Sequence, residues 1–589
     1  MRKAVLAALL LSAVTLSAAD RVEPLFVPEA IGMTQRAAAP RIAQSSGLDA
    51  IVTLAAATDV VPEEIDALRT WNAEGRTPAK NGFTRHIGGA LQVRVGGSGE
   101  VAALSTIGKL TKSNSGSTIW SGSVRVENAY RFRVHLRNVV APAGTTFWVY
   151  GADGVATAFG TELIDANRDL YVPSVGGDVA YLEMEVPAGQ QATFDVADVL
   201  EIFAAKPGLQ ALDAPTCLVD GKCVGSGTLD VIEQLGRAVA HLQYVKGGDG
   251  YVCSGGLLND TDTSNTVPYL LTANHCFSAQ SSATSLEAYW DYRTTSCGAA
   301  FPNLNSVTRT VGSTLLATSA NSDFTFVRMN SIPSNRILLG WDSRTSVVAA
   351  GVTLHRLSHP FPDDYNVPAP QFYSSTLVTT TSQTCSARPR PNYLYSTKIQ
   401  GGTYGGSSGS PVIIAGGYVV GQLFGACGPT PTSGCDAANY TVDGALSSTY
   451  PSISQYLSPT PSANCTPSST TACVLNNRFR VQVKYRPSFD TLPPDTNASV
   501  KSVSGFANPS FESVFFYFNS DSNIEMLVKI LDQGNTNSQG QATIAVLFAT
   551  ATPLGIEVTI TDTTNGATKT YKSNFGAMTG GTDFTAFIK

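Results

Sequence analysis

Short apolar runs separated by Gly- and Pro-rich turns recur along the chain, a pattern typical of β-strands. Between residues 83 and 203 this pattern predicts a β-sandwich-like region. Its expected strands are residues 91–95, 123–126, 131–136, 146–150 and 182–186. One short helix is expected before it, over residues 62–71. The pattern therefore predicts an all-β protein.

The pattern continues through a second region, from about residue 212 to 457, where short strands alternate with Gly, Ser and Thr turns. Its clearest apolar runs cover residues 267–271 and 418–423. Residues 458–473, which follow, are rich in Pro, Ser and Thr. This composition indicates a linker.

The last region, residues 474–589, again alternates apolar and polar positions, and it predicts a small β-sandwich domain. The alternating runs are residues 479–484, 513–518 and 556–561. Asn565-Gly566 lies between two strand-like runs and predicts a tight hairpin. The region holds no histidine, so we expect a binding or stabilising module rather than a catalytic one.

The N-terminus has the order of a secretory signal. Arg2 and Lys3 precede an apolar run at residues 4–16 and the small residues 17–19, with cleavage expected after Ala19. The run is shorter than the roughly 20 residues that span a bilayer. We therefore expect export, and no membrane segment in the mature form.

Length and charge exclude several classes of protein. The 589 residues are too many for one hydrophobic core. The formal net charge is −6 and only 14% of the residues are charged, compared with about 25% in typical proteins. No run of like charges is present, so no nucleic acid is expected as a partner.

All ten cysteines fall between residues 217 and 473, and in an exported protein they predict disulfides. They are Cys217, Cys223, Cys253, Cys276, Cys297, Cys385, Cys427, Cys435, Cys465 and Cys473. No CxxC pair occurs, which argues against a zinc ribbon or a thioredoxin-type site.

His275 is the best candidate for a general base among six histidines. It ends the apolar run that begins at residue 267, and Cys276 follows it directly. Cys253 lies on the strand before, so a Cys253–Cys276 bridge would close a loop of roughly 20 residues and hold the imidazole at a strand end.

Two further motifs complete a constellation for nucleophilic catalysis. Residues 404–411 surround Ser408 with glycines, which allow a tight turn that points backbone N–H groups at one spot, as an oxyanion requires. Asp323 precedes an apolar strand and could accept a hydrogen bond from His275. A serine becomes a nucleophile only when such a base removes its proton.

These motifs, in this order, resemble the chymotrypsin/trypsin-like serine endopeptidases, and within them the bacterial secreted lysyl endopeptidase (Lys-C-like) group. The resemblance runs from about residue 217 to 457. Its residues are Thr272-Ala273-Asn274-His275-Cys276, Tyr289-Trp290-Asp291-Tyr292, Ser322-Asp323-Phe324-Thr325, Gly405-Gly406-Ser407-Ser408-Gly409-Ser410-Pro411 and Gly421-Gln422-Leu423.

The resemblance implies a double β-barrel with its site in the crevice between two six-stranded halves. It implies that Ser408 is the nucleophile, His275 the base and Asp323 its orienting partner, with the N–H groups of Gly406 and Ser408 as the oxyanion hole. Substrate would bind as an added β-strand. The disulfides it implies are Cys217–Cys435, Cys223–Cys297, Cys253–Cys276 and Cys385–Cys427, with Cys465–Cys473 as a local bridge.

The chain departs from the family pattern around the expected substrate pocket. Basic-specific trypsin-like enzymes often carry an Asp six residues before the nucleophile, where this chain has Gly402. Asp436 and Asp443 fall in the region that supplies the pocket acid of the lysyl group, and either one facing the pocket would favour Lys or Arg before the cleaved bond. Where the lysyl enzymes carry a histidine, this chain has Phe424.

Two other hydrolase readings fail on the residues. Ser407 satisfies the nucleophile elbow of α/β-hydrolases, but those enzymes need a histidine later in the chain and none follows His359. His355 and His359 have metal-like spacing, but no Glu lies between them and Pro360 follows at once. No metal and no cofactor are expected.

We therefore expect a preproenzyme with a signal at residues 1–19, a propeptide at 20–211, a protease domain at 212–457, a linker, and a C-terminal domain at 474–589. Its expected partners are protein or peptide substrates and its own propeptide. The alternative is a catalytically inactive secreted protein of β-domains that serves in binding or adhesion.

Overall fold

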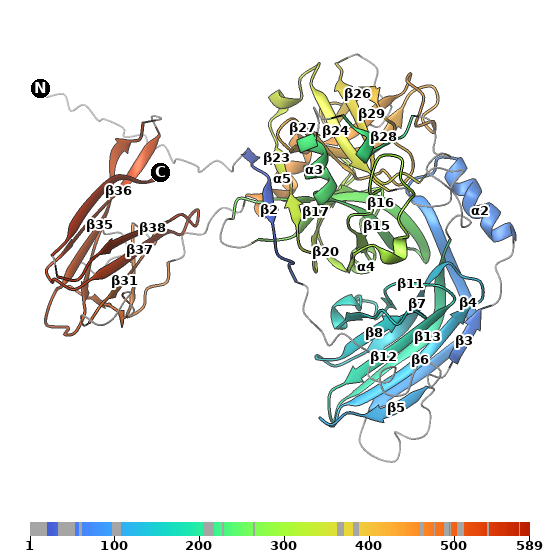
Figure 1. Cartoon of the computed structure of the whole chain (residues 1–589), viewed down its shortest axis with the longest axis horizontal. Helices are drawn as coiled ribbons and strands as arrows, with labels where there is room; N and C mark the ends of the chain where they lie inside the picture. The colour runs from blue at the N-terminus through green and yellow to red at the C-terminus, as the bar shows by residue number, and fades with distance from the viewer. Residues whose placement is uncertain are drawn as a thin grey trace, which may run out of the picture. The chain divides into compact units, whose positions relative to one another are not determined.

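In the structure, a computed structural model, most of the regular secondary structure is β-strand (Figure 1), which confirms the all-β prediction. It describes residues 20–32, 53–57, 62–96, 108–203, 217–225, 229–262, 266–361, 370–380, 388–458, 465–475, 477–487, 494, 496–503, 512–538, 541–576 and 578–588. These form two compact units: one holds Asp20–Asn259 and Val267–Ile453, and the other holds Asp260–Thr266 and Ser454–Lys589. The predicted export signal lies outside the described residues.

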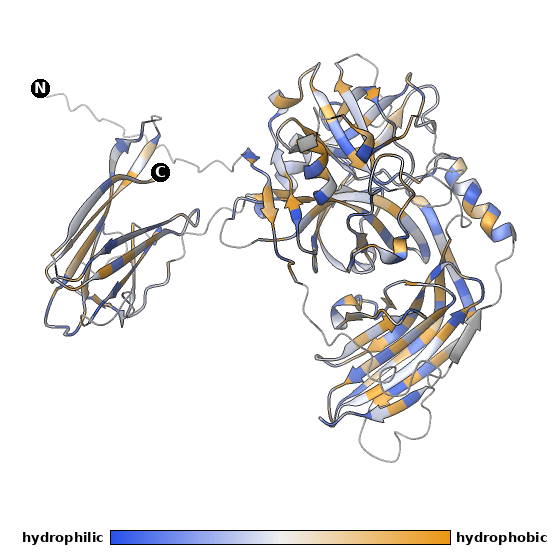
Figure 2. Ribbon diagram, in the orientation of Figure 1, coloured by the Kyte–Doolittle hydropathy of each residue, from blue (hydrophilic) through white to orange (hydrophobic). Residues whose placement is uncertain are grey.

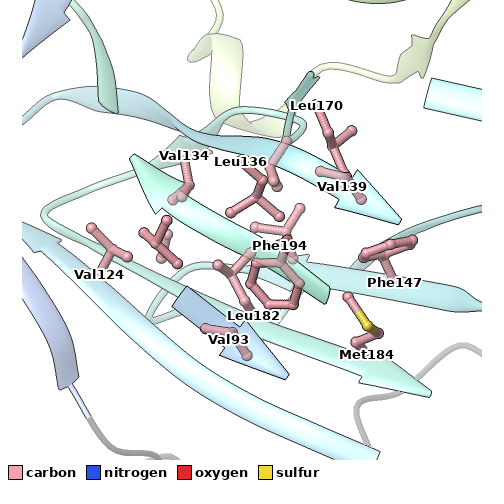
Figure 3. Packing of buried hydrophobic residues seen from close by; sticks show 14 of the residues in the cluster. Val93, Val124, Val134, Leu136, Val139, Phe147, Leu170, Leu182, Met184 and Phe194 are labelled. Carbon is pink, nitrogen blue, oxygen red and sulfur yellow. The ribbon is translucent and has the colours of Figure 1, made fainter. Parts of the chain in front are cut away.

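The pro-region, as we call the described part of residues 20–203, builds its core between two layers of strands (Figure 3). One layer is a sheet of β3 (Thr53–Ala57), β5 (Lys109–Lys112), β6 (Thr118–Val126), β8 (Thr146–Tyr150), β9 (Thr157–Phe159) and β12 (Val179–Val186). The other contains β4 (Ala79–Gly96), β7 (Arg131–Val140), β10 (Leu170–Tyr171), β11 (Val175–Gly176) and β13 (Gln191–Ile202). Hydrophobic and hydrophilic residues alternate along these strands (Figure 2), so one face of each layer is apolar and the two apolar faces bury each other.

The second layer of the pro-region continues into the next region of the chain. The first residues of β4 pair antiparallel with β16 (Asp249–Leu258), so Ala79 lies opposite Val252. One sheet of 12 strands therefore spans both regions. The helix α2 (Pro62–Ala73) precedes β4, as the sequence predicts, and extends two residues further.

The first barrel of the protease-like region surrounds a core that includes Trp290 and the disulfide of Cys253. Its strands are β15 (Val239–Lys246), β16, β17 (Tyr269–Ala273), β18 (Glu287–Tyr289), β19 (Arg309–Val311), β20 (Ser313–Ser319) and β21 (Phe324–Met329). Two short helices, α3 (Leu229–Ala238) and α4 (Gln280–Thr284), belong to the same region.

The second barrel is a closed ring, because β28 pairs with both β27 and β29 and the other strands complete the circuit. Its strands are β24 (Thr353–Ser358), β25 (Phe372–Val378), β26 (Tyr393–Gln400), β27 (Pro411–Ile414), β28 (Tyr418–Cys427) and β29 (Tyr440–Ala445). The helix α5 (Leu446–Leu457) follows it. The barrels that the family resemblance implies are thus present.

Further short strands pair around these barrels. The N-terminal strands β1 (Arg21–Val22) and β2 (Leu25–Val27) pair with β23 (Gly340–Asp342) and β22 (Arg336–Leu338), respectively. The strand β14 (Val219–Asp220) pairs with β25. The pro-region therefore holds the protease-like region at its very first residues as well as through β4.

The other unit contains two five-stranded sheets that contribute to one core. They are formed by β30 (Thr471–Val474), β31 (Phe479–Tyr485), β32 (Thr496–Asn497), β37 (Ile556–Asp562) and β38 (Thr568–Ser573), and by β33 (Ser499–Lys501), β34 (Ser513–Tyr517), β35 (Met526–Thr536), β36 (Ala542–Thr550) and β39 (Gly580–Ile588). The strand β30 and the Cys465–Cys473 bridge belong to this unit, so the second half of the expected linker is folded.

The hairpin predicted at Asn565-Gly566 forms between β37 and β38, but its loop is wider than a two-residue turn. The amide of Asp562 donates to the carbonyl of Ala567, and the amide of Gly566 donates to that of Asp562. The Asp562 carboxylate also accepts a hydrogen bond from the amide of Thr564. This side-chain cap stabilises the longer loop. No helix in the described part of the chain is long and apolar enough to cross a membrane.

Candidate active site

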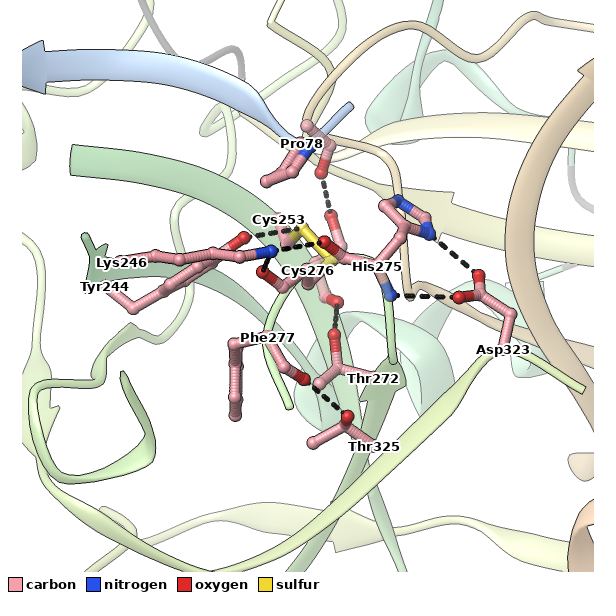
Figure 4. Close-up of a disulfide and its surroundings, with 12 residues drawn as sticks. Pro78, Tyr244, Lys246, Cys253, Thr272, His275, Cys276, Phe277, Asp323 and Thr325 are labelled. Carbon is pink, nitrogen blue, oxygen red and sulfur yellow. Dashed lines mark hydrogen bonds and ion pairs between the residues drawn. A yellow bond between two sulfur atoms is a disulfide. The ribbon is translucent and has the colours of Figure 1, made fainter. Parts of the chain in front are cut away.

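His275 and Asp323 meet because two neighbouring strands place them at the same edge. His275 comes two residues after β17, Asp323 comes directly before β21, and the two strands pair antiparallel with Ala273 opposite Phe324. His275 Nδ1 lies 2.7 Å from Asp323 Oδ2, and the backbone N–H of His275 donates to Oδ1 at 2.9 Å (Figure 4). The carboxylate thus holds both the ring and the main chain of the histidine.

Asp323 is itself held tightly. Its side chain is only 6% exposed, and its φ of 52° lies in the left-handed region. The Gln422 side-chain amide, on β28 of the second barrel, donates to the carbonyl oxygens of Ser322, at 2.6 Å, and Asp323, at 3.2 Å. In the sequence Gln422 is only part of a family motif, and its contact with Asp323 could not be predicted because the two residues lie about 100 positions apart.

Ser408 lies in a loop pressed against the strand that leads to His275. Gly409 has a φ of 79°, and a Cβ there would lie 2.2 Å from the hydroxyl oxygen of Thr272 on β17. Only glycine permits this approach. The amide of Ser254 on β16 donates to the Ser408 carbonyl at 2.8 Å, and this hydrogen bond holds the loop against β16. Ser254 was not predicted as a site residue, since a lone serine in a strand carries no local signal.

Two backbone N–H groups of this loop point away from its anchored carbonyls. The Gly405 carbonyl accepts from the Phe361 amide, and the Ser407 carbonyl accepts from the Ser410 amide. Because a trans peptide places N–H opposite C=O, the amides of Gly406 and Ser408 point the other way. Neither amide donates a hydrogen bond within the described part of the chain. Such a pair of free donors can bind an oxyanion.

No hydrogen bond between Ser408 and His275 occurs among the described residues. Nε2 of His275 is buried and has no hydrogen-bond partner there. The Phe424 ring lies edge-on to the imidazole at 5.7 Å between ring centroids. Asp323 and His275 are therefore brought into contact, Ser408 is placed beside their strand, and the imidazole keeps the acceptor position that a base needs.

Four predicted disulfides are present: Cys217–Cys435, Cys223–Cys297, Cys253–Cys276 and Cys465–Cys473. The bridge next to His275 ties β16 to the residue after the imidazole (Figure 4). The fifth prediction, Cys385–Cys427, involves Cys385, which lies outside the described residues.

The predicted pocket residues have different surroundings. Gly402 and Asp436 line a small pocket together with Thr403 and Ala426. Asp443 does not line it: this carboxylate is fully buried and pairs with the Arg356 guanidinium. Burial raises the pKa of Asp443, and the Arg356 charge works against that rise. Asp443 therefore stabilises the second barrel rather than facing a substrate.

The residues of the rejected α/β-hydrolase and metal-site hypotheses form contacts within the fold. Ser407 is fully buried, and its hydroxyl accepts a hydrogen bond from Ser358 at 3.0 Å. His355 Nδ1 lies 2.6 Å from the Tyr373 hydroxyl, and His359 is buried against the ring of Tyr292.

The cleft beside Ser408 is bounded on one side by the pro-region. Its lining includes Asn72, Glu74, Gly75, Arg76, Thr77 and Ala79 from the pro-region, and Thr403, Tyr404, Gly405, Ser408, Leu423, Phe424, Gly425, Ala426, Pro431 and Thr432 from the second barrel. Pro78 lies in the chain between the lining residues Thr77 and Ala79, and Figure 4 shows it close to the Cys253–Cys276 disulfide. No local signal predicted that residues 72–79 border this cleft, because the second-barrel residues that they face are more than 300 positions away.

Comparisons with known proteins agree with the family resemblance. Residues 212–440 match the family model described as lysyl endopeptidase, C-terminal domain. A lysyl endopeptidase of Pseudomonas aeruginosa is 27% identical over 211 residues, which cover 33% of this chain and 45% of the relative. The alignment thus spans less than half of that relative's length. The resemblance to lysyl endopeptidases is confirmed for this segment.

Solved protease structures are also similar to part of the chain. An inactivated protease paralogue of the scabies mite has 14% sequence identity and a TM-score of 0.28, and it covers 38% of this chain and 95% of its own. The protease Anisep of Arthrobacter nicotinovorans has 17% identity and a TM-score of 0.28, with 38% and 97% covered.

Proposed function

We propose that this chain is the precursor of a secreted serine endopeptidase that cleaves peptide bonds through an acyl-enzyme on Ser408. The observation that carries the proposal is the His275–Asp323 pair: the carboxylate lies 2.7 Å from Nδ1, and Nε2 has no hydrogen-bond partner among the described residues. The match to lysyl endopeptidases over residues 212–440 supports the same chemistry.

In the proposed reaction Ser408 Oγ attacks the carbonyl carbon of the scissile bond while His275 Nε2 takes its proton. Asp323 keeps the ring in the tautomer that offers Nε2 and stabilises the imidazolium that forms. The N–H groups of Gly406 and Ser408 would bind the oxyanion of the tetrahedral intermediate. His275 then gives the proton to the leaving amine, and a water, activated by the same histidine, releases the acyl group.

We also propose that the pro-region keeps the enzyme latent. It lines the cleft next to Ser408, and its strand β4 adds to β16 with Ala79 opposite Val252, one residue before Cys253. A substrate bound as an added strand would compete for this edge. The disulfides and the signal-like N-terminus support export as the route by which the precursor reaches its place of action.

Several contacts hold residues 71–80 of the pro-region in place, as a block of the cleft requires. The Asn72 side chain binds both the carbonyl and the amide of Lys80, each at 2.9 Å. The Lys80 ammonium pairs with Asp249 at 2.7 Å and lies 4.5 Å from the centre of the Trp71 ring. Each of these contacts fixes the chain just after the residues that line the cleft.

Labelling with a fluorophosphonate tests the proposal. The processed protein should be labelled at one serine, and Ser408→Ala should remove the label together with peptide hydrolysis. Ser407→Ala is the matched control, because Ser407 would be the nucleophile if the protein were an α/β-hydrolase. The Ser407→Ala variant should still be labelled. A processed wild-type protein that takes no label and cleaves no peptide would contradict the proposal and favour the inactive binding protein.

A further inference from the structure

A second, polar pocket adjoins the cleft beside Ser408. Thr403 and Ala426 line both the cleft and this pocket, so the two are adjacent. A side chain that enters between the loop before Ser408 and the strand β28 would therefore reach it. Its other lining residues are Ser374, Thr376, Lys398, Gly401, Gly402, Ser433, Gly434, Asp436, Asn439, Tyr440 and Thr441.

The pocket contains a cation that belongs to the chain itself. Lys398, at the end of β26, donates from Nζ to the carbonyl oxygen of Gly434 at 2.6 Å and approaches that of Asp436 at 3.4 Å. An ammonium group has three donors, so one remains for a ligand. No carboxylate of the described residues lies within ion-pair distance of Lys398; burial lowers the pKa of its ammonium, and the nearby charge of Asp436 partly offsets this.

Two hydroxyl groups in the same pocket also lack partners. Ser374 and Thr376 lie on β25 and are 3% and 2% exposed. The hydroxyl oxygens of both are buried and form no hydrogen bond within the described part of the chain. Buried polar groups normally have partners, so two orphan hydroxyls beside an ammonium indicate a place for a hydrogen-bond acceptor that a ligand brings.

The acid in the pocket is already engaged by its own loop. The Asp436 carboxylate accepts hydrogen bonds from the Thr430 hydroxyl and, at 2.8 Å, from the Ala438 amide. These bonds lower the pKa of Asp436. A substrate Lys or Arg entering here would have to approach the Lys398 ammonium, and like charges at close range repel.

We infer that this pocket receives the side chain before the cleaved bond, and that it selects an acidic side chain, Glu or Asp, whose carboxylate binds Lys398 and the hydroxyls of Ser374 and Thr376. This inference rests on the proposed endopeptidase function. It replaces the preference for Lys or Arg that the sequence suggested through Asp436 and Asp443, because the first is engaged by its loop and the second is buried with Arg356.

A peptide series tests the inference on the processed protein. Fluorogenic peptides that differ only in the residue before the cleaved bond would carry Glu, Asp, Gln, Ala, Lys or Arg. The expected kcat/KM for Glu or Asp is at least tenfold above that for Gln, Lys and Arg. A higher kcat/KM for Lys or Arg, or no difference between Glu and Gln, would overturn the inference.

Lys398→Met removes the charge and keeps most of the length of the side chain. It should lower kcat/KM for the Glu peptide at least tenfold and leave the Ala peptide within about threefold. The matched control is Lys222→Met, which removes the same charge at an exposed lysine outside the pocket and should not lower cleavage after Glu. An unchanged ratio of Glu to Gln cleavage in Lys398→Met would contradict the assignment of Lys398.

Fluorophosphonate labelling separates this inference from the proposed function. If the wild-type protein and Lys398→Met are both labelled at Ser408 but show no acidic preference, the inference fails and the endopeptidase stands. If the processed protein takes no label and cleaves none of the peptides, the proposed function fails and the inference falls with it.

Discussion

Asp323 shows how one side chain can carry both the geometry and the electrostatics of a site. One carboxylate oxygen accepts from the backbone of His275 and the other contacts its ring. The backbone of Asp323 is held in turn by Gln422 from the other barrel. The pair is thus fixed from both barrels, so the imidazole has one orientation available to it.

Replacement of Asp323 should therefore damage catalysis more than stability. Asp323→Asn keeps the shape but offers His275 a donor in place of one acceptor, which favours the wrong tautomer. We expect kcat to fall by roughly three to four orders of magnitude, with an unchanged thermal unfolding midpoint. Steady-state kinetics of the processed enzyme at neutral pH would measure this, and a loss below tenfold would contradict the role assigned to Asp323.

The buried Arg356–Asp443 pair is a second residue-scale test, of stability rather than function. Both side chains are about 1% exposed or less. Removing one partner leaves the other charge buried without compensation, which costs about 3–5 kcal/mol. Asp443→Asn should lower the free energy of unfolding by that amount, measured by denaturant unfolding. The double variant Asp443→Leu with Arg356→Met should recover most of the loss, and equal losses in both would contradict this explanation.

At the scale of elements, the alternation of apolar and polar residues and the positions of turn residues predicted individual strands and the helix, because these form from local sequence. Strands β6, β7, β8 and β12 and the helix α2 lie where alternation and turn residues placed them, because a half-buried strand repeats every two residues. The pairing of β4 with β16 could not be predicted in this way. It joins residues about 170 positions apart and depends on the shape of both partners, which no short window of sequence contains.

This pairing gives a prediction at the same scale. Ala79 is 3% exposed, pairs with Val252 and lies against Gly405 of the serine loop. Ala79→Glu would bury a charge without a partner and push the strand out of the cleft. The isolated pro-region with this change should inhibit the processed enzyme at least tenfold more weakly, as measured by its inhibition constant.

The control for this experiment is Val155→Glu, which makes the same chemical change at a pro-region residue that is 74% exposed. It should inhibit as well as the wild-type pro-region. If both variants inhibit equally, the contact at Ala79 does not block the cleft.

At the scale of the whole compact unit that carries the site, a buried cluster of charges joins the pro-region to the protease-like region. Glu287 on β18 accepts from the amide of Ser174 at 2.6 Å and pairs with Arg309 at 3.2 Å. Burial raises its pKa, but the charges of Arg309, Arg133 and Arg131 outweigh it, so the pKa of Glu287 falls to about 2. Arg133, Arg131 and Ser174 belong to the pro-region.

Acid should therefore weaken the hold of the pro-region. Arg309 lowers the pKa of Glu287 whether or not the pro-region is bound, whereas Arg133 and Arg131 lower it further only in the joined state. The contribution of the carboxylate to binding is therefore complete at neutral pH and is lost as the pH falls towards about 2. We expect the inhibition constant of the isolated pro-region to rise over this range. Arg133→Met in the pro-region should flatten the pH dependence, and an equally steep profile for this variant would contradict the role of the cluster.

The members of the candidate site could be proposed from the sequence, but their surroundings could not. His275, Asp323 and Ser408 each belong to a local motif, so the sequence alone is enough to propose them. Ser254 and Gln422 form contacts between distant strands, and the sequence around Ser254, Gln422 and Lys398 is ordinary for a strand. The preference of the substrate pocket for Lys or Arg stays a prediction for the same reason, since acidity along the chain does not reveal which carboxylates their own neighbours already engage.

The most direct test of the central claim is to trap the acyl-enzyme. The processed protein would be mixed with an ester substrate that deacylates slowly, quenched in acid and digested, and the adduct located by mass spectrometry. We predict one acyl group on the peptide that contains Ser408, and none in His275→Ala within the same time. An acyl group on another residue would contradict the account. So would a Ser408→Ala variant that hydrolyses the ester as fast as the unchanged protein.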